Sequence, residues 1–238
     1  MSQTVENTDI SVIMAVYGLV RGVFVKDKKE FIDFMADAGV LLFGDFTAKS
    51  GRKTPYFVNT GNYKTGEHIS KLGDWYGAEV AACGETFDAL YGPAYKGITL
   101  VAATAAALYR NHGIDLPFFF NRKEAKDHGE GGAIVGYKPK DGDRIAIIED
   151  VVTAGTAVRE SLELLKSAAD VRVTALFVSV DRMERGTGEL SALQELKEAH
   201  GINVYPIITV QDIIASIPEG DERAEKMRSY LSLYGPAR

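Results

Sequence analysis

Apolar residues recur along this chain with the period of helices in some segments and the composition of strands in others. In residues 30–38 they fall at i, i+3, i+4 and i+7, the stripe of an amphipathic helix, and Gly39 is placed to end it. Ser191 and Gln194 form the capping box of a later helix, which Gly201 is placed to end. Helices are predicted over residues 30–38, 69–80, 98–109, 157–168 and 193–199.

Short apolar and β-branched runs between these segments indicate strands. They are predicted over residues 56–58, 87–91, 116–121, 144–148, 171–180 and 204–210, and the charged stretch 49–55 is predicted to be a loop. Strands that alternate with helices imply a parallel sheet covered on both faces, and such sheets bind ligands beyond the carboxyl ends of their strands. We therefore expect an α/β fold with a doubly wound, mostly parallel sheet and a site at its strand ends.

Composition narrows the class of protein. The chain has 238 residues, is 46% apolar and contains no Pro/Ser-rich linker, so we expect one large domain. A formal charge of −6 argues against a general nucleic-acid surface, so any phosphate site must be local. The single cysteine, Cys83, excludes an intramolecular disulfide and suits a reducing cytoplasm. The apolar stretch 10–25 is too short to span a membrane, contains Arg21, and lacks the basic start of a secretory signal. We expect a cytoplasmic protein with no membrane segment.

The most informative segment is an apolar strand that ends in Glu149 and Asp150 and is followed by a turn of small and hydroxyl residues that opens a helix. Free N–H groups at the helix start and the hydroxyls of Thr153 and Thr156 can surround one anion, and Gly155 allows close approach. Carboxylates beside a phosphate need another partner, such as sugar hydroxyls or magnesium, so a sugar phosphate fits. The Walker and dinucleotide glycine patterns are missing. The alternative is a simple helix cap beside two solvated carboxylates.

This segment resembles the motif with which type I phosphoribosyltransferases bind phosphoribosyl pyrophosphate (PRPP): apolar residues, two acidic residues and Thr-x-Gly-Thr. The resemblance implies that residues 154–157 hold the 5-phosphate of PRPP and that Glu149 and Asp150 face its ribose hydroxyls. It covers most of the chain and implies one domain over residues 29–238 with a small hood, built from the amino-terminal third and the carboxyl-terminal segments. Residues 1–28 form an extension whose role stays open.

Residues 121–132 form a long polar connection rich in glycine, and connections of this length are more often functional than filler. From composition alone, a plain solvated loop is an equal alternative. The stretch resembles the catalytic loop of orotate phosphoribosyltransferases. That likeness implies a lid that closes over the neighbouring subunit of a homodimer and brings Lys126 and His128 to the pyrophosphate.

Residues 92–97, Gly-Pro-Ala-Tyr-Lys-Gly, form a second candidate anion loop at a strand end before a helix. The same resemblance makes Tyr95 and Lys96 contacts of PRPP and implies a cis peptide bond between Ala94 and Tyr95. The alternative is a simple Gly-Pro turn with an exposed lysine.

Two segments bear on the base that accepts the sugar. Residues 46–57 resemble the hood of the orotate enzymes, in which Lys49 reaches the ligand and Phe57 and Val58 form the floor; many members carry Phe where Val58 stands. Arg182 follows the strand 171–180, and the resemblance assigns it to the carboxylate of orotate, which a guanidinium can hold with two parallel hydrogen bonds. Composition alone favours a solvated charge cluster there.

The resemblance as a whole implies transfer of the phosphoribosyl group from PRPP to orotate, with Mg²⁺ held mainly by the pyrophosphate and no confident protein ligand. The implied catalytic residues are Lys126, His128, Glu149 and Asp150. The implied PRPP contacts are Lys49, Tyr95, Lys96, Arg122, Lys123, Lys126, His128, Glu149, Asp150, Val151, Val152, Thr153, Ala154, Gly155, Thr156 and Ala157. The implied orotate contacts are Lys49, Phe57, Val58, Thr153 and Arg182. Two rivals stay open: a phosphoribosyltransferase for a purine or nicotinate, and a PRPP-binding regulator without catalysis.

Overall fold

The centre of the protein is a six-stranded sheet with the strand order β5-β4-β3-β6-β7-β8. The computed structural model describes residues 27–48, 51–123, 133–152, 155–186 and 188–236. Neighbouring strands run parallel, except that β5 pairs antiparallel with β4 at one edge. The strands are β3 (Ala89–Gly92), β4 (Phe118–Asn121), β5 (Ile134–Gly136), β6 (Arg144–Ile148), β7 (Arg172–Asp181) and β8 (Asn203–Thr209). The mostly parallel sheet expected from the alternation of elements is confirmed.

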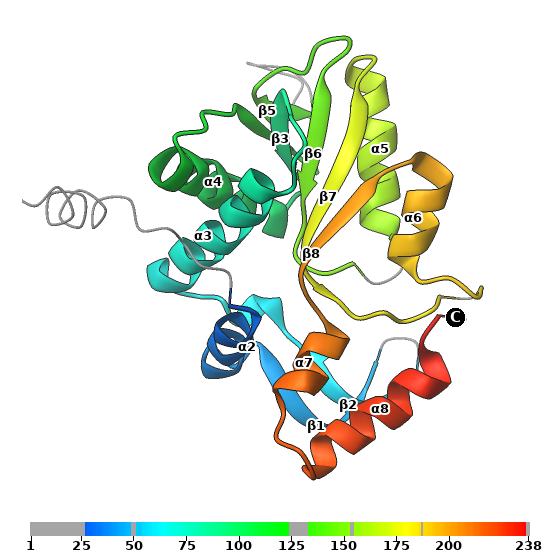
Figure 1. The fold of residues 1–238 in the computed structure, drawn as a ribbon. Coiled ribbons are helices and arrows are strands. Elements are labelled where there is room, and N and C mark those ends of the chain that lie inside the picture. The colour runs from blue at the N-terminus through cyan, green and yellow to red at the C-terminus, as the bar shows by residue number, and fades with distance from the viewer. Residues whose placement is uncertain (1–26, 49–50, 124–132, 153–154, 187, 237–238) are drawn as a thin grey trace, which may run out of the picture.

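Helices cover both faces of this sheet, because its inner strands are apolar on both sides (Figure 1). In β6, Ala146 and Ile148 join one hydrophobic cluster, whereas Ile145 and Ile147 join another. Successive side chains of a strand point to opposite faces, so a strand covered on both faces is apolar throughout. The first cluster includes residues of α3 (Gly66–Ala82) and α4 (Lys96–Ala107), and the second includes residues of α5 (Thr156–Ala168) and α6 (Ala192–His200).

The predicted caps of α6 are confirmed, whereas α2, α3 and α4 each begin two or three residues earlier than predicted. Ser191 and Gln194 form the capping box of α6, and Gly201 ends this helix in the left-handed conformation with φ 67°. At its carboxyl end α4 continues into a π-helical turn, Leu108–His112.

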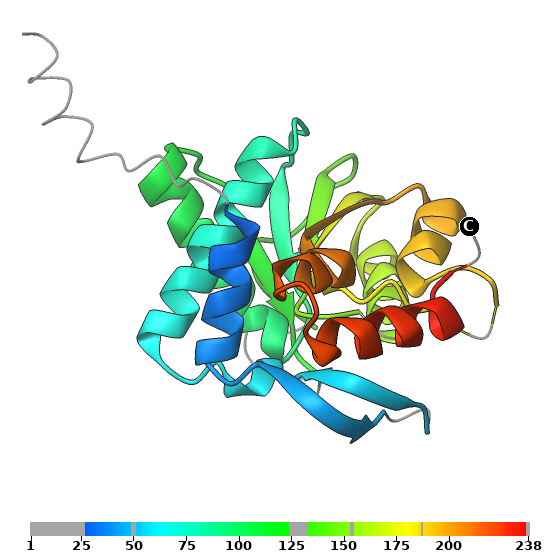
Figure 2. The same cartoon turned by 60° about the horizontal axis from the view of Figure 1, so that its bottom comes forward.

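A hood lies beyond the carboxyl ends of the central strands (Figure 1). It consists of a two-stranded antiparallel hairpin and three helices: β1 (Leu41–Thr47), β2 (Lys53–Val58), α2 (Lys28–Asp37), α7 (Val210–Ser216) and α8 (Glu222–Tyr234). Figure 2 shows α8 running alongside this hairpin. Phe31, Tyr56 and Met227 of the hood belong to the same hydrophobic cluster as Leu90 and Ile148 of the sheet. The hood is therefore continuous with the core, and it combines the two ends of the described chain as expected.

The sequence patterns did not predict β1, β5, α7 or α8, and the predicted loop over residues 49–55 is wrong where β2 already begins at Lys53. Pro55 favoured a loop in the prediction because proline is unusual inside a strand. The register of β1 is irregular between Phe43 and Phe46, opposite Pro55. A proline placed beside such an irregularity need not interrupt the hydrogen bonds of the ladder.

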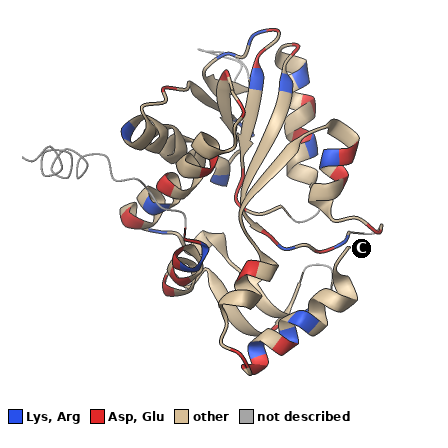
Figure 3. Ribbon diagram, in the orientation of Figure 1, with Lys and Arg blue, Asp and Glu red and all other residues tan. Residues whose placement is uncertain are grey.

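Charged side chains of both signs are interspersed on the outer helices α5, α6 and α8 (Figure 3). Within the described ranges, no helix combines the length and the apolar character needed to cross a bilayer. The apolar stretch 10–25 lies outside those ranges, as does most of the predicted extension, so the boundary at residue 28 stays a prediction.

Candidate active site

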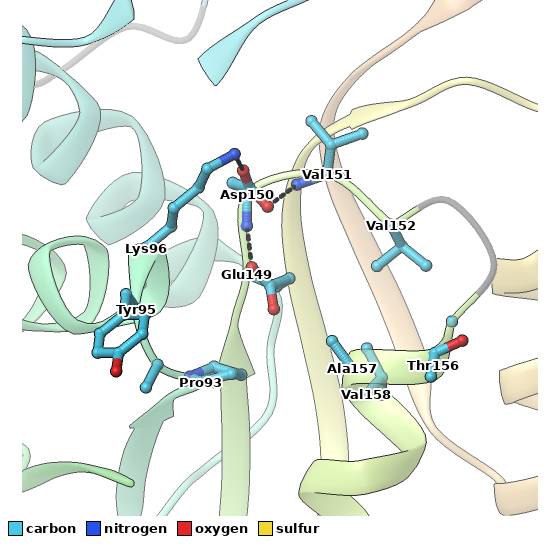
Figure 4. A pocket seen from close by; sticks show the side chains of 12 residues that line it. Pro93, Tyr95, Lys96, Glu149, Asp150, Val151, Val152, Thr156, Ala157 and Val158 are labelled. Carbon is cyan, nitrogen blue, oxygen red and sulfur yellow. Dashed lines mark hydrogen bonds and ion pairs between the residues drawn. The ribbon is translucent and has the colours of Figure 1, made fainter. Parts of the chain in front are cut away.

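A cavity of about 340 Å³ opens at the carboxyl ends of β3 and β6, at the edge of the sheet where a ligand site was expected. Three segments line it: residues 93–96 after β3, residues 149–152 after β6, and residues 155–158 at the start of α5 (Figure 4). Most of the predicted PRPP contacts that the structure describes therefore lie together around one space.

The two acidic residues after β6 are held through their backbone. The Glu149 N–H donates to the Phe177 carbonyl at 3.0 Å, and the Glu149 carbonyl accepts a 2.7 Å hydrogen bond from the Tyr76 hydroxyl. The Asp150 carbonyl accepts from both the N–H and the hydroxyl of Ser179, at 2.9 and 2.7 Å. Hydrogen bonds from β7 and from Tyr76 of α3 thus hold the backbone of Glu149 and Asp150 and orient both side chains.

Asp150 is tied to a lysine and a threonine from two other segments. Its Oδ2 accepts from Lys96 Nζ at 2.8 Å and from Thr60 Oγ1 at 2.6 Å, and its Oδ1 accepts from the Val151 N–H at 2.7 Å. Burial opposes ionisation of this carboxyl, but the hydrogen bonds from Lys96 and Thr60 outweigh burial and lower its pKa. Asp150 therefore carries a negative charge at neutral pH.

Glu149 has the opposite character, although it is the adjacent residue. It is 8% exposed, and its Oε1 accepts from the Asp150 N–H at 2.9 Å. Burial first, and the charge of Asp150 second, raise the pKa of Glu149 to about 8. The raised pKa of Glu149 favours its protonated form, which can donate a hydrogen bond, whereas the ionised Asp150 can only accept.

The start of α5 forms the side of the cavity opposite Lys96 (Figure 4). The N-cap residue is Gly155, with φ 72°, and no side chain caps the helix among the described residues. First-turn N–H groups lack partners within a helix and attract anions, helped by the positive end of the helix dipole. This is the arrangement expected for the 5-phosphate of a sugar phosphate.

The turn between β3 and α4 depends on two glycines that lie against each other. A Cβ at Gly92 would lie 2.1 Å from the Gly97 carbonyl oxygen, and one at Gly97 would lie 2.8 Å from the Gly92 carbonyl carbon. The peptide bond between Ala94 and Tyr95 is cis, as the resemblance implied. Tyr95 is 67% exposed, so its ring lies at the mouth of the cavity.

Two site residues were missed by the sequence analysis. Thr60 lies in a short 3-10 turn after β2 and donates to Asp150 from 90 residues away in sequence. Asn121 ends β4, and its Oδ1 accepts from both the Tyr91 hydroxyl at 2.9 Å and the Ala94 N–H at 2.8 Å. A polar residue at a strand end was a usable signal for Asn121, whereas nothing in the local sequence distinguished Thr60.

Comparisons with known proteins agree with this geometry. Residues 62–193 match the sequence family described as the phosphoribosyl transferase domain. The chain is 52% identical over 218 residues to the orotate phosphoribosyltransferase of Clostridium beijerinckii, covering 87% of this chain and 97% of that protein. This chain belongs to the orotate phosphoribosyltransferase family. The orotate phosphoribosyltransferase of Yersinia enterocolitica is 47% identical over 87% of this chain and 98% of its own length. The crystal structure of orotate phosphoribosyltransferase from Francisella tularensis has a TM-score of 0.79 at 36% identity, over 87% of this chain and 99% of that one.

Three of the predicted orotate contacts are described, namely Phe57, Val58 and Arg182, and they lie outside the lining of the cavity. Phe57 is 36% exposed on β2 and packs against Phe46, with ring centroids 5.6 Å apart, and Val58 is half-buried against the core. The side chain of Arg182 is 12% exposed and hydrogen-bonds to Glu184. The assignment of these residues to orotate stays a prediction.

The predicted lid is only partly described. Arg122 is half-buried, and its N–H donates to the Ala133 carbonyl at 2.7 Å. Lys123 is exposed, with its Nζ 5.2 Å from the centroid of the Tyr95 ring. This contact places the start of the segment beside the turn after β3. The predicted site residues Lys49, Lys126, His128, Thr153 and Ala154 lie outside the described residues.

Proposed function

We propose that this chain transfers the 5-phosphoribosyl group from PRPP to orotate, forming orotidine 5′-monophosphate and pyrophosphate. The observation that carries the proposal is the pair Glu149 and Asp150, set between the start of α5 and Lys96 in one cavity. A phosphate site on one side, a carboxyl pair in the middle and a cation on the other match the phosphate, ribose and pyrophosphate of PRPP in that order. Membership in the orotate phosphoribosyltransferase family supports orotate as the acceptor.

In this mechanism the N–H groups at the start of α5 hold the 5-phosphate, together with Thr153 and residues 154–157. Glu149 donates to one ribose hydroxyl, while the ionised Asp150 accepts from another. The ring nitrogen of orotate, already anionic, attacks the anomeric carbon as the bond to pyrophosphate breaks. The sugar gains positive charge in that step, and the negative charge of Asp150 stabilises it.

Lys96 and Tyr95 are placed to receive the departing pyrophosphate. In the structure Lys96 is paired with Asp150, whose side chain is only 14% exposed, whereas that of Lys96 is 60% exposed. Lys96 can therefore turn toward a phosphate in the cavity, while the Thr60 hydroxyl and the Val151 N–H still donate to Asp150. Negative charge develops on the leaving group, and a positioned ammonium stabilises it. We propose that Arg122, Lys123, Lys126 and His128 add to this stabilisation when the lid closes.

Magnesium fits this site as a companion of the substrate. In the described ranges no cluster of three or more His, Cys, Asp or Glu side chains could hold a metal ion. Asp150 is already engaged by Lys96 and Thr60, and the raised pKa of Glu149 favours its protonated form. We propose that Mg²⁺ is held mainly by the pyrophosphate, where it would neutralise charge on the leaving group.

Orotate is expected to bind between Phe57, Val58, Lys49 and Thr153, with its carboxylate on Arg182. We further propose a cytoplasmic homodimer in which the lid of one subunit serves the site of the other. The contact of Lys123 with Tyr95 supports the position of the lid at the pyrophosphate end, and the trans arrangement rests on the family resemblance.

A phosphoribosyl-transfer assay with PRPP, Mg²⁺ and each of three acceptors, or with no acceptor, tests the function. Orotate should give product and pyrophosphate, whereas hypoxanthine, nicotinate and a blank without acceptor should not. Faster turnover with a purine or nicotinate would indicate a different base specificity. PRPP binding without pyrophosphate release for any acceptor would indicate a regulator.

A further inference from the structure

The turn after β7 brings two opposite charges to the same side of the chain. The Asp181 carboxylate accepts a 2.7 Å hydrogen bond from the Met183 N–H, and Met183 has a φ of 50°, a conformation that few non-glycine residues adopt. This tight turn lets Arg182 and Glu184 meet although they are only two residues apart. Positive φ at a residue other than glycine costs free energy and tends to persist where the surroundings require it.

One oxygen of Glu184 accepts three hydrogen bonds from its neighbours. Its Oε1 accepts from Arg182 Nε at 2.9 Å and Nη2 at 2.6 Å, and from the Tyr56 hydroxyl at 3.2 Å. The side chains of Arg182 and Glu184 are 12% and 19% exposed, and Tyr56 is fully buried. The guanidinium also lies over the Tyr56 ring, 5.0 Å from its centroid. Arg182 is therefore oriented by three contacts before any ligand arrives.

The cluster is supported from the hood. Tyr230 of α8 packs edge-on against Tyr56, with ring centroids 6.2 Å apart at 88°. The Arg185 N–H donates to the Tyr234 carbonyl at 2.9 Å, which fastens the turn after β7 to the end of the same helix. Three elements far apart in sequence thus surround Arg182: β2 and the turn contact it directly, and α8 packs against Tyr56 of β2 and binds the turn.

The two hydrogen bonds of Arg182 to Glu184 use one edge of its planar group, through Nε and Nη2. The other edge, formed by Nη1 and Nη2, has the fork geometry that matches a carboxylate. A guanidinium held along one edge keeps the second at a constant angle, which reduces the conformational entropy lost when a carboxylate binds. If Glu184 and the carboxylate of a ligand used the same edge of Arg182, they would compete for it. They can bind Arg182 together when each uses a different edge.

We propose that Glu184 is a positioning residue, which holds Arg182 by one edge so that the other is presented to the carboxylate of the pyrimidine substrate. The inference deepens the proposed function and rests on its assignment of Arg182 to that carboxylate. The Tyr56 hydroxyl acts as the second support, because it anchors the same Glu184 oxygen. Glu184 thereby contributes to selection of a carboxylated pyrimidine without touching it.

Kinetics of Glu184→Ala and Glu184→Gln test this role, with Glu189→Ala as a matched control, since Glu189 is an exposed carboxylate in the same loop. We expect Glu184→Ala to raise the KM for orotate about tenfold or more, which is about 1.4 kcal/mol of binding. The KM for PRPP should change little, whereas the Tm of Glu184→Ala should fall, because the guanidinium of Arg182 and the Tyr56 hydroxyl lose their partner. Glu184→Gln should recover most of the loss, because its amide oxygen still accepts from Arg182 and Tyr56.

Three results would overturn the proposal: equal rises in both KM values, a fall in the KM for orotate, or a Glu184→Gln enzyme as impaired as Glu184→Ala. The first would indicate a purely structural residue, the second a competitor of the ligand, and the third a role for charge alone. Arg182→Ala in the same assays separates this inference from the proposed function. If Arg182→Ala leaves the KM for orotate unchanged in an active enzyme, the carboxylate is bound elsewhere and the assignment of Arg182 is wrong.

Discussion

Glu149 and Asp150 are adjacent and chemically alike, yet their surroundings give them different protonation states. Asp150 receives hydrogen bonds from Lys96 and Thr60, whereas Glu149 is buried and receives one from the Asp150 N–H. Pairs of carboxyl groups whose environments separate their pKa values commonly divide the roles of donor and acceptor. Here that division suits two neighbouring hydroxyl groups of one ribose.

The protonation of Glu149 has a measurable consequence for stability without ligand. Its folded pKa of about 8 lies above its usual value of 4.5, so between these values the folded state binds more protons than the unfolded state. The contribution of Glu149 to stability is therefore fully present below about pH 4.5 and is lost as the pH rises toward 8. We expect the free energy of unfolding to fall more steeply over this range in wild type than in Glu149→Gln. Urea unfolding at several pH values measures both slopes; parallel curves would contradict the raised pKa.

Asp150→Asn should impair the use of PRPP and spare orotate. The substitution removes the negative charge that stabilises the developing cation on the sugar, at a cost of about 2 kcal/mol, or roughly thirtyfold in kcat/KM for PRPP. The KM for orotate should stay within about twofold of wild type, since Asp150 does not face the base in the proposed mechanism. Asp115→Asn, at an exposed position, is the control for the substitution itself. Unchanged kinetics with PRPP would mean that Asp150 only pairs with Lys96.

At the scale of elements, α4, which begins at Lys96, packs closely against α3. A Cβ at Gly73 of α3 would lie 2.6 Å from the Ala103 carbonyl oxygen of α4. Glycine at this position is needed for packing, although it is a poor helix former. The first residue of α4 is Lys96, whose ammonium pairs with Asp150.

Gly73→Ala should destabilise the protein by about 1 to 3 kcal/mol, because overpacking against backbone atoms outweighs the gain in helix propensity. Gly66→Ala in the same helix is the matched control, since a Cβ there would meet no heavy atom within 4 Å. That variant should be neutral or slightly stabilised. Thermal or urea unfolding of both compares them directly, and equal stabilities would show that the helices can move apart at little cost.

At the scale of the whole molecule, the hood and the sheet share one hydrophobic cluster, with Tyr56 and Met227 packed in the same core as Leu90. The hood therefore cannot be treated as an independently folded cap. Arg182, the proposed partner of the base, is held between the hood and the end of β7, whereas the proposed phosphate site is lined by strand ends of the sheet and the start of α5. Substrate selection and phosphate binding thus depend on different parts of one core.

The proposed homodimer makes a prediction about mixed subunits. If the lid works in trans, Lys126 of one chain and Arg182 of the other belong to one active site. Mixing inactive Lys126→Ala subunits with Arg182→Ala subunits would create heterodimers in which one site carries both substitutions and the other carries neither. Activity should rise well above that of either parent, toward half of wild type per heterodimer. If mass measurements show subunit exchange and activity does not rise, the lid serves its own chain.

The sequence alone determined the features that depend on neighbours along the chain. An apolar run ending in Glu149 and Asp150, then a small-residue turn, specifies strand, turn and helix through local preferences. The capping box of α6 and the glycine that ends this helix are local in the same sense. Because parallel strands end at one edge, the location of the cavity followed from the order of these elements.

Contacts between residues far apart in sequence, and the properties that follow from them, became visible only in the folded structure. Thr60 reaches Asp150 across 90 residues, and Tyr56 reaches Glu184 across 128, and no local pattern encodes either contact. The protonation state of Glu149 likewise follows from burial, which is a property of the packed molecule. Strand β2 begins at Lys53 despite Pro55 because its partner strand is irregular at that point. Hydrogen-bond partners, solvent exposure and strand register are all set by packing. The sequence therefore identifies the chemical groups of this site, whereas the fold determines which of them are in contact and which of them are ionised.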